Sequence, residues 1–222
     1  MEARSPAQFL RHRLRLMSLT AVLFVAEAFL LALAGFWWWP LSVIALVPVY
    51  LLARATVLGG PLDPVALRSG IRGEVRVAGL LAELEPDGYR VLHDVDLGRG
   101  NADHVLIGPA GVFVIETKDW GGRFYPRRGR LMFNNRRADD VVGQVTTAAL
   151  EIRRRLELAG IDVWVQAVIA STRAKVSASP IRLGHITAVD ASGLPAFVRG
   201  RKATLDATTA DGVVAALLRD AA

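Results

Sequence analysis

The chain has 222 residues, 22% of them charged, and a formal net charge of +6 at pH 7. It contains no cysteine, which excludes a disulfide scaffold, a thiolate zinc site and a cysteine nucleophile. Four scattered histidines exclude a histidine-rich metal cage, and the mean hydropathy of +0.33 indicates an apolar segment rather than a uniformly soluble chain.

The apolar residues are concentrated near the N-terminus. Over residues 17–58 the charged side chains are Glu27 and Arg54 alone. Residues 17–36 provide the roughly 20 apolar positions that a helix needs to cross a bilayer core, and residues 41–58 form a second, shorter run. We therefore expect a two-helix transmembrane hairpin over residues 17–58.

The flanks of this hairpin indicate its orientation. Residues 1–16 are basic, arginines also end and follow the second run, and residues 37–40 (WWWP) resemble a turn in the headgroup layer. These features predict a multi-pass protein of the cytoplasmic membrane with both ends in the cytoplasm. The alternative is a signal peptide, because residues 32–34 (ALA) resemble a small-x-small cleavage site.

Residues 59–69, rich in Gly and Pro, are expected to link the hairpin to a domain at residues 70–222. The hydrophobic periodicity of this domain predicts strands, a β-hairpin and helices in alternation. In chain order we expect a helix over 73–84, strands over 89–95, 103–107 and 112–118, a hairpin over 124–133 with its turn at Gly129-Arg130, a helix over 139–159, strands over 163–170 and 186–189, and a helix over 212–219. The fold class is therefore α/β, with a mixed sheet flanked by helices.

The strand at residues 112–118 (VFVIETK) carries the most informative polar residues. Because strand side chains alternate between faces, Glu116 and Lys118 share a face with two valines. A tight turn joins this strand to the preceding one, so Asp103 is expected near Glu116. Two neighbouring carboxylates repel each other, and a divalent cation such as Mg²⁺ is a usual partner. A lysine beside it can orient or deprotonate a water and stabilise developing charge.

Two further polar residues lie at apolar positions of the predicted helices. Glu74 has the spacing of the core-facing residues of its helix, and Gln144 has the same position in the helix over 139–159. A buried carboxylate is costly unless it is paired, so a metal ion or Lys118 is the expected partner of Glu74. Each feature has a purely structural alternative: a cross-strand ion pair for Glu116 and Lys118, a helix-start residue for Glu74, and a turn residue for Asp103.

Taken together, Gly73-Glu74, the block DHVLIGPAGVFVIETK (residues 103–118), Trp120-Gly121-Gly122 and Gln144 resemble the nuclease-related domain (NERD) family. This family is similar to the PD-(D/E)XK nucleases, which implies a restriction-endonuclease-like core with its motifs in residues 70–150. The resemblance implies Mg²⁺ or Mn²⁺ held by Asp103 and Glu116, and no small organic cofactor. It also implies a catalytic set: Glu74, Asp103, Glu116, Lys118 and Gln144.

Arginines interleaved with aromatic residues follow the proposed site strand, and those expected to bind nucleic acid are Arg123, Arg127, Arg128 and Arg130. Such a pattern can bind phosphates and stack bases. A solvated hairpin, or one that faces anionic lipid headgroups, would show the same pattern. His104 is expected to be structural.

The sequence thus predicts a membrane-anchored, metal-dependent hydrolase acting on the phosphodiester bonds of DNA. The alternative is a catalytically silent module on the same fold that binds nucleic acid or a protein at the membrane. All the carboxylates and Lys118 are present, which favours the enzyme.

Overall fold

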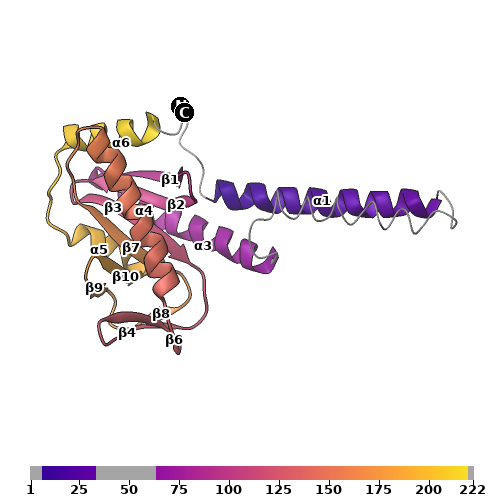
Figure 1. Ribbon diagram of the computed structural model, residues 1–222. Helices are drawn as coiled ribbons and strands as arrows, with labels where there is room; N and C mark the ends of the chain where they lie inside the picture. The colour runs from indigo at the N-terminus through magenta and orange to yellow at the C-terminus, as the bar shows by residue number, and fades with distance from the viewer. Residues whose placement is uncertain (1–6, 34–63, 220–222) are drawn as a thin grey trace. The chain divides into compact units, whose positions relative to one another are not determined.

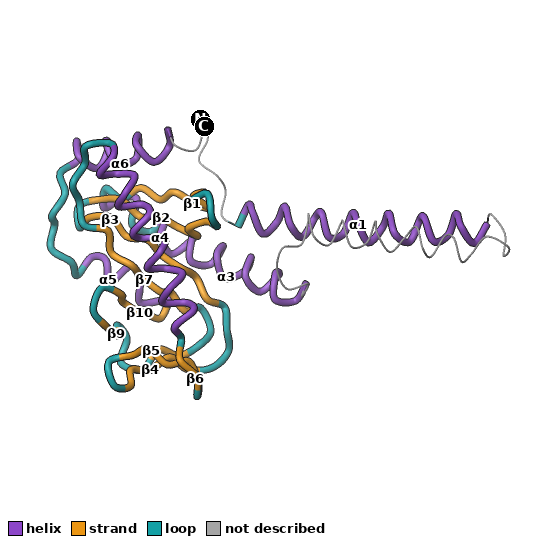
Figure 2. The backbone as a smooth tube through the Cα atoms, viewed as in Figure 1, coloured by secondary structure: helices purple, strands orange, loops and turns teal. Residues whose placement is uncertain are grey.

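A computed structural model describes residues 7–33 and 64–219, which form two compact units. The larger unit begins at Ser69 and includes residues 7 and 8, and the smaller contains residues 9–33 and 64–68. The helices and strands appear in Figures 1 and 2. In chain order they are α1 (Gln8–Leu33), α3 (Pro64–Ala82), η2 (Glu85–Asp87), β1 (Arg90–Asp96), β2 (Asn101–Gly108), β3 (Gly111–Lys118), β4 (Arg123–Arg127), β5 (Arg130–Phe133), β6 (Arg136–Arg137), α4 (Asp139–Leu158), β7 (Val165–Ser171), β8 (Lys175–Val176), β9 (Ile181–Leu183), β10 (Ile186–Asp190), η3 (Ala191–Gly193), α5 (Leu194–Arg199) and α6 (Ala207–Arg219).

The main sheet has six strands in the order β1-β2-β3-β7-β10-β9. The first three strands are antiparallel to one another, whereas β7 is parallel to both β3 and β10. A parallel connection needs a crossover, and α4 supplies it between β3 and β7. The predicted mixed sheet flanked by helices is therefore confirmed.

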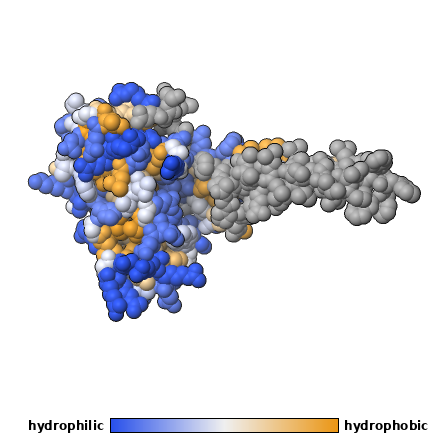
Figure 3. Space-filling model, viewed as in Figure 1, coloured by the Kyte–Doolittle hydropathy of each residue, from blue (hydrophilic) through white to orange (hydrophobic). Residues whose placement is uncertain are grey.

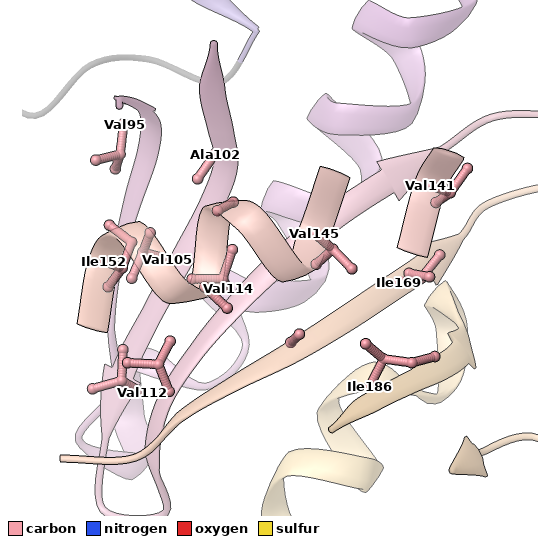
Figure 4. Close-up of a cluster of buried hydrophobic side chains, with 14 of the residues drawn as sticks. Val95, Ala102, Val105, Val112, Val114, Val141, Val145, Ile152, Ile169 and Ile186 are labelled. Atoms are coloured by element: carbon pink, nitrogen blue, oxygen red, sulfur yellow. The ribbon is translucent and has the colours of Figure 1, made fainter. Parts of the chain in front are cut away.

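Two hydrophobic cores lie on opposite faces of this sheet. Val112 and Val114 of β3 pack in the core that contains α4 and α6, part of which is drawn in Figure 4. Phe113 and Ile115 of the same strand pack in the core that contains α3 and α5. This confirms the predicted alternation of β3, and it places Glu116 and Lys118 on the face covered by α4.

A second sheet follows the end of β3, with its strands in the order β6-β5-β4-β8. The predicted hairpin forms its centre, but Arg127 pairs with Arg130, so the turn is Arg128-Gly129 rather than Gly129-Arg130. Both turn residues have positive φ, 49° and 73°, the conformation that two-residue hairpin turns require. The short strands β8 and β9 were not predicted, because two or three residues carry too little periodicity.

The N-terminal predictions have different outcomes. The first predicted membrane segment overlaps α1, yet no helix in the described ranges is long and apolar enough to cross a membrane, so the transmembrane hairpin is not supported. Its second segment, residues 41–58, lies outside the described residues. Residues 64–69 of the predicted linker are helical and form the start of α3. Pro64 is compatible with this early start, because proline is tolerated in the first helical turn.

Candidate active site

The C-terminal end of β3 holds a buried ion pair. The Glu116 side chain is 3% exposed, that of Lys118 is 15% exposed, and Lys118 Nζ lies 2.5 Å from Glu116 Oε1. β3 lies between β2 and β7 in the sheet, and cores that contain α4 and α3 cover its two faces, so its side chains have little access to water. The ion pair sits at the point where the apolar face of the strand ends.

Asp103 joins this pair from β2. His104 lies opposite Ile115 in the ladder, and Asp103 Oδ2 accepts a 2.7 Å hydrogen bond from the backbone N–H of Thr117. The structure therefore brings Asp103 beside Glu116, as expected from the tight turn. Asp103 is half-buried as a residue.

Glu74 reaches the same site from α3. It is 6% exposed and packed among the apolar residues of its helix, as its spacing predicted. Its pKa is raised to about 8, first by burial and then by the negative charges of Asp94 and Glu116, while Lys118 partly opposes the shift. A carboxyl group in this setting holds a proton more firmly than one in water.

Gln144 lies on α4, where its Oε1 accepts a 3.1 Å hydrogen bond from Lys118 Nζ. The residue is exposed, so the expectation that it faces the core is wrong. It lies one helical turn from the buried Val141 and just before Val145, at the border of the buried stripe. From there its side chain still reaches Lys118, which is thus held between Glu116 and Gln144.

Asp94 of β1 was not among the predicted site residues. It is 4% exposed, its Oδ1 accepts a 2.7 Å hydrogen bond from Asn101 Nδ2, and its φ is +54°. A non-glycine residue in this region is uncommon and is often found at functional sites. The available signal was an acidic residue directly before Val95 in a predicted strand.

Carboxylates therefore outnumber cations in this site: Glu74, Asp103 and Glu116 lie near Lys118, and Asp94 lies near Glu74. The pKa of Asp103 is raised by burial first, and then by the charges of Glu116 and Glu74. Burial likewise raises the pKa of Glu116, although Lys118 opposes that shift. Such an excess of buried negative charge favours a proton or a cation.

The donor set suits Mg²⁺ or Mn²⁺. Among the residues that the structure describes, no three His, Cys, Asp or Glu side chains are grouped to hold a metal ion. Mg²⁺, however, commonly takes one or two carboxylates and completes its shell with water and phosphate oxygens. Asp103 and Glu116, adjacent and partly uncompensated, fit that requirement.

Asp119 forms hydrogen bonds that connect the elements around the site. Its Oδ2 accepts a 2.5 Å hydrogen bond from Ser69 Oγ in α3, its Oδ1 accepts one from Thr172 Oγ1, and its backbone carbonyl accepts two from Arg173. These bonds join α3, the end of β3 and the loop after β7. The contacts of Asp119 were not predictable from its position directly after the predicted strand at residues 112–118.

A close approach of α3 to β3 depends on Gly73. A methyl group there would lie 3.0 Å from Asp119 Cβ and 3.2 Å from Thr117 Cγ2, whereas one at Gly79 of the same helix would meet nothing within 4 Å. We therefore expect Gly73→Ala to lower the free energy of unfolding by about 1–3 kcal/mol through overpacking. Gly79→Ala should raise it by about 0.5–1 kcal/mol through helix propensity.

Urea unfolding followed by circular dichroism measures both changes. Both variants replace a glycine of α3 by alanine, so Gly79→Ala is a matched control for Gly73→Ala. Equal shifts of the same sign in both variants would contradict a close contact at Gly73.

His104 lies on the other face of the sheet, as expected for a structural residue. Its Nδ1 is 2.8 Å from His93 Nδ1, and their rings meet edge to face. The pKa of His104 is lowered to about 3, mainly by burial and in addition by the nearby His93. His104 therefore stays neutral at physiological pH and takes no part in the carboxylate site.

Glu74 and His104 give the metal-free protein opposite pH dependences. Folding takes up a proton at Glu74 between its folded pKa of about 8 and its unfolded pKa near 4.5. The free energy of unfolding should therefore rise by up to about 1.4 kcal/mol per unit as pH falls from 8. Below about pH 6.5, the unfolded pKa of histidine, His104 opposes this gain, because protonation favours the unfolded chain.

The contribution of Glu74 can thus be measured without that of His104 between about pH 8 and pH 6.5. Denaturation in EDTA across this window should show that the free energy of unfolding of the native chain rises as pH falls. The same quantity should depend less on pH in Glu74→Gln. An unchanged slope in Glu74→Gln would contradict the raised pKa.

The predicted nucleic-acid-binding arginines lie together on the second sheet. Arg123 and Arg127 belong to β4, Arg130 to β5, and Arg128 to the turn between them, and all four are exposed. Hydrophilic side chains gather over this end of the molecule in Figure 3. Arg130 Nη1 is 3.7 Å from Asp139 Oδ2, so part of this charge is shared with α4.

The region that carries these residues is similar to known proteins. Residues 69–172 match the family model of the nuclease-related domain. A segment of 61 residues is 39% identical to an uncharacterized protein of Bacillus anthracis and covers 25% of this chain and 29% of that protein. The match thus spans less than a third of the relative, and no solved structure matches the chain. The part of the chain that is similar to the nuclease-related domain, residues 69–172, thus contains Lys118 and the four carboxylates of the site.

Proposed function

We propose that the chain is a metal-dependent nuclease that hydrolyses phosphodiester bonds in DNA. The observation that carries the proposal is Lys118, held between Glu116 Oε1 and Gln144 Oε1 in a site that also contains Asp103 and Glu74. A mere structural ion pair would not require three further groups around it. The match to the nuclease-related domain supports the same chemistry.

In this mechanism Asp103 and Glu116 hold Mg²⁺ or Mn²⁺. The ion, when bound, polarises the phosphoryl group and makes an attacking water more acidic. Lys118 orients that water and neutralises charge that develops on the phosphoryl oxygens, while Gln144 and Glu116 fix the position of Nζ. The water oxygen bonds to phosphorus, the P–O ester bond breaks, and the leaving oxygen takes up a proton. Glu74, which readily keeps a proton, completes the carboxylate shell.

Cleavage of plasmid and linear DNA by the purified full-length chain tests this proposal. We expect cleavage with Mg²⁺ or Mn²⁺ and none with EDTA. DNA binding without cleavage under both metals would instead support the second candidate, a silent DNA-binding module. The exposed arginines of β4 and β5 favour that candidate independently of the carboxylates.

The arginines themselves can be tested in either case. Arg127→Ala with Arg128→Ala should weaken DNA affinity and reduce the slope of log affinity against log salt by about 2, because two phosphate contacts are lost. Fluorescence anisotropy over a salt series measures this slope. Arg153→Ala with Arg154→Ala removes the same charge from α4, where both arginines pair with glutamates, and should leave the slope unchanged. Equal slopes in the two double variants would contradict a DNA contact on the second sheet.

We also propose a membrane location with a cytoplasmic domain, on the composition of residues 17–58 alone. Cell fractionation with an alkaline carbonate wash tests it, because a spanning chain stays in the pellet. Release of the chain by that wash would contradict the proposal.

A further inference from the structure

Trp120 lies at the mouth of the candidate active site. It follows Lys118 by two residues, and the Lys118 Nζ is 5.5 Å from the centroid of its ring. The residue is 38% exposed, although most large hydrophobic side chains of the domain are buried. An exposed indole beside a nearly buried lysine offers a flat apolar surface next to the reacting groups.

Two aromatic side chains of the second sheet pack against the Trp120 ring. Phe124 stacks with it at a centroid distance of 6.3 Å and an interplanar angle of 21°, and Phe133 lies at 5.0 Å. These two rings also contact each other at 4.9 Å, and Phe124 is fully buried. The position of the Trp120 ring is therefore fixed by packing before any ligand arrives, which reduces the entropy that binding would cost.

The same two strands that anchor Trp120 carry exposed cations. Phe124 is flanked by Arg123 in β4, and Phe133 ends the strand that begins with Arg130. A fixed aromatic platform beside a row of cations is the combination that proteins use for single-stranded nucleic acids, in which bases stack on rings and phosphates contact arginines. In an intact duplex the base faces are covered by neighbouring bases, so they cannot stack on a protein ring.

We propose that Trp120 is a base-stacking platform that selects single-stranded DNA, or a frayed duplex end, at this site. A base that packs on the exposed part of the indole lies close to Lys118, because Nζ is 5.5 Å from the centroid of the same ring. The proposal names the substrate class of the proposed nuclease and rests on that function for its catalytic consequence. The binding step itself does not depend on cleavage.

The test compares single-stranded and duplex DNA of one sequence, bound by the full-length chain in EDTA and followed by fluorescence anisotropy. Stacking of one base contributes about 1–3 kcal/mol, so Trp120→Leu should weaken single-strand affinity about 5- to 100-fold. Duplex affinity should change little, and Trp120→Phe should retain most of the single-strand affinity because it keeps an aromatic face. With metal, the native chain should cleave single strands faster than duplex, and Trp120→Leu should lose that preference.

Trp164 provides a matched control. It is 60% exposed and an arginine, Arg153, lies 5.5 Å from its ring centroid, yet it precedes β7 at the end opposite Lys118. Trp164→Leu should change neither affinity. Thermal denaturation of each variant separates loss of stacking from loss of fold, since Phe and Leu both keep an apolar side chain beside Phe124.

The outcomes distinguish this proposal from the proposed nuclease activity. Single-strand binding that depends on an aromatic residue at position 120, without cleavage, would refute the nuclease and support the platform. Equal loss of single-strand and duplex affinity in Trp120→Leu, no loss at all, or failure of Trp120→Phe to restore binding would overturn the platform. A native chain that binds no DNA would overturn both.

Discussion

Replacing Lys118 by Ala is expected to lower the rate of DNA cleavage by about 10²- to 10⁴-fold, the range for a group that orients a nucleophile and stabilises developing charge. The change removes the ammonium between Glu116 and Gln144 and leaves the carboxylates in place. DNA affinity should change little, because one cation among many is lost. Single-turnover cleavage with excess enzyme measures the chemical step, and anisotropy measures binding.

Two further variants make this result specific. Lys118→Met keeps most of the side-chain volume without the charge and should be as inactive as Lys118→Ala. Lys202→Ala removes an exposed lysine that borders a cavity at the other end of β3 and should be fully active. Cleavage by Lys118→Met at the native rate would show that the ammonium has no part in the reaction.

Asp103→Asn should have opposite effects on activity and on stability. The neutral amide weakens metal binding, which costs several kcal/mol of charge stabilisation and lowers cleavage by about 10²- to 10³-fold. The same change relieves repulsion with Glu116 and Glu74. The metal-free protein should therefore gain about 1–3 kcal/mol of unfolding free energy. The Asn oxygen can still accept the hydrogen bond from the Thr117 N–H.

Thermal unfolding with and without Mg²⁺ measures both effects. The native chain should melt higher when Mg²⁺ is added, because a ligand that binds the folded state stabilises it. Asp103→Asn should melt higher without the ion and respond less to it. A variant that unfolds at lower temperature, with its response to Mg²⁺ intact, would show that Asp103 is a structural residue of the strand.

The sequence predicted the central part of the site because that part depends on local rules. Alternation along β3 places Glu116 and Lys118 on one face, and the tight turn to β2 brings Asp103 beside them. Helical periodicity likewise predicted the inward position of Glu74. Each of these inferences needs a few neighbouring residues and a repeat of two or 3.6 positions.

The contributions of Asp94, Asp119 and Trp120 depend on contacts between distant segments. Asp94 enters the site through an unusual backbone conformation in β1. Asp119 binds residues about 50 positions away on both sides, and the Trp120 ring is fixed by side chains of β4 and β5. No periodicity encodes such pairings, so they emerge from the assembled fold alone.

If the proposed function holds, the division into two sheets separates the reacting groups from the arginines that bind DNA. The ladder that positions Glu116 and Lys118 is made by β2, β3 and β7, and none of its backbone hydrogen bonds in the described chain comes from β4, β5 or β6. Insertions, deletions or charge changes at the tip of the β4–β5 hairpin therefore leave the register of the reactive strand intact. We therefore expect that hairpins of different length or charge can replace this one while Glu116 and Lys118 keep their positions in the main sheet.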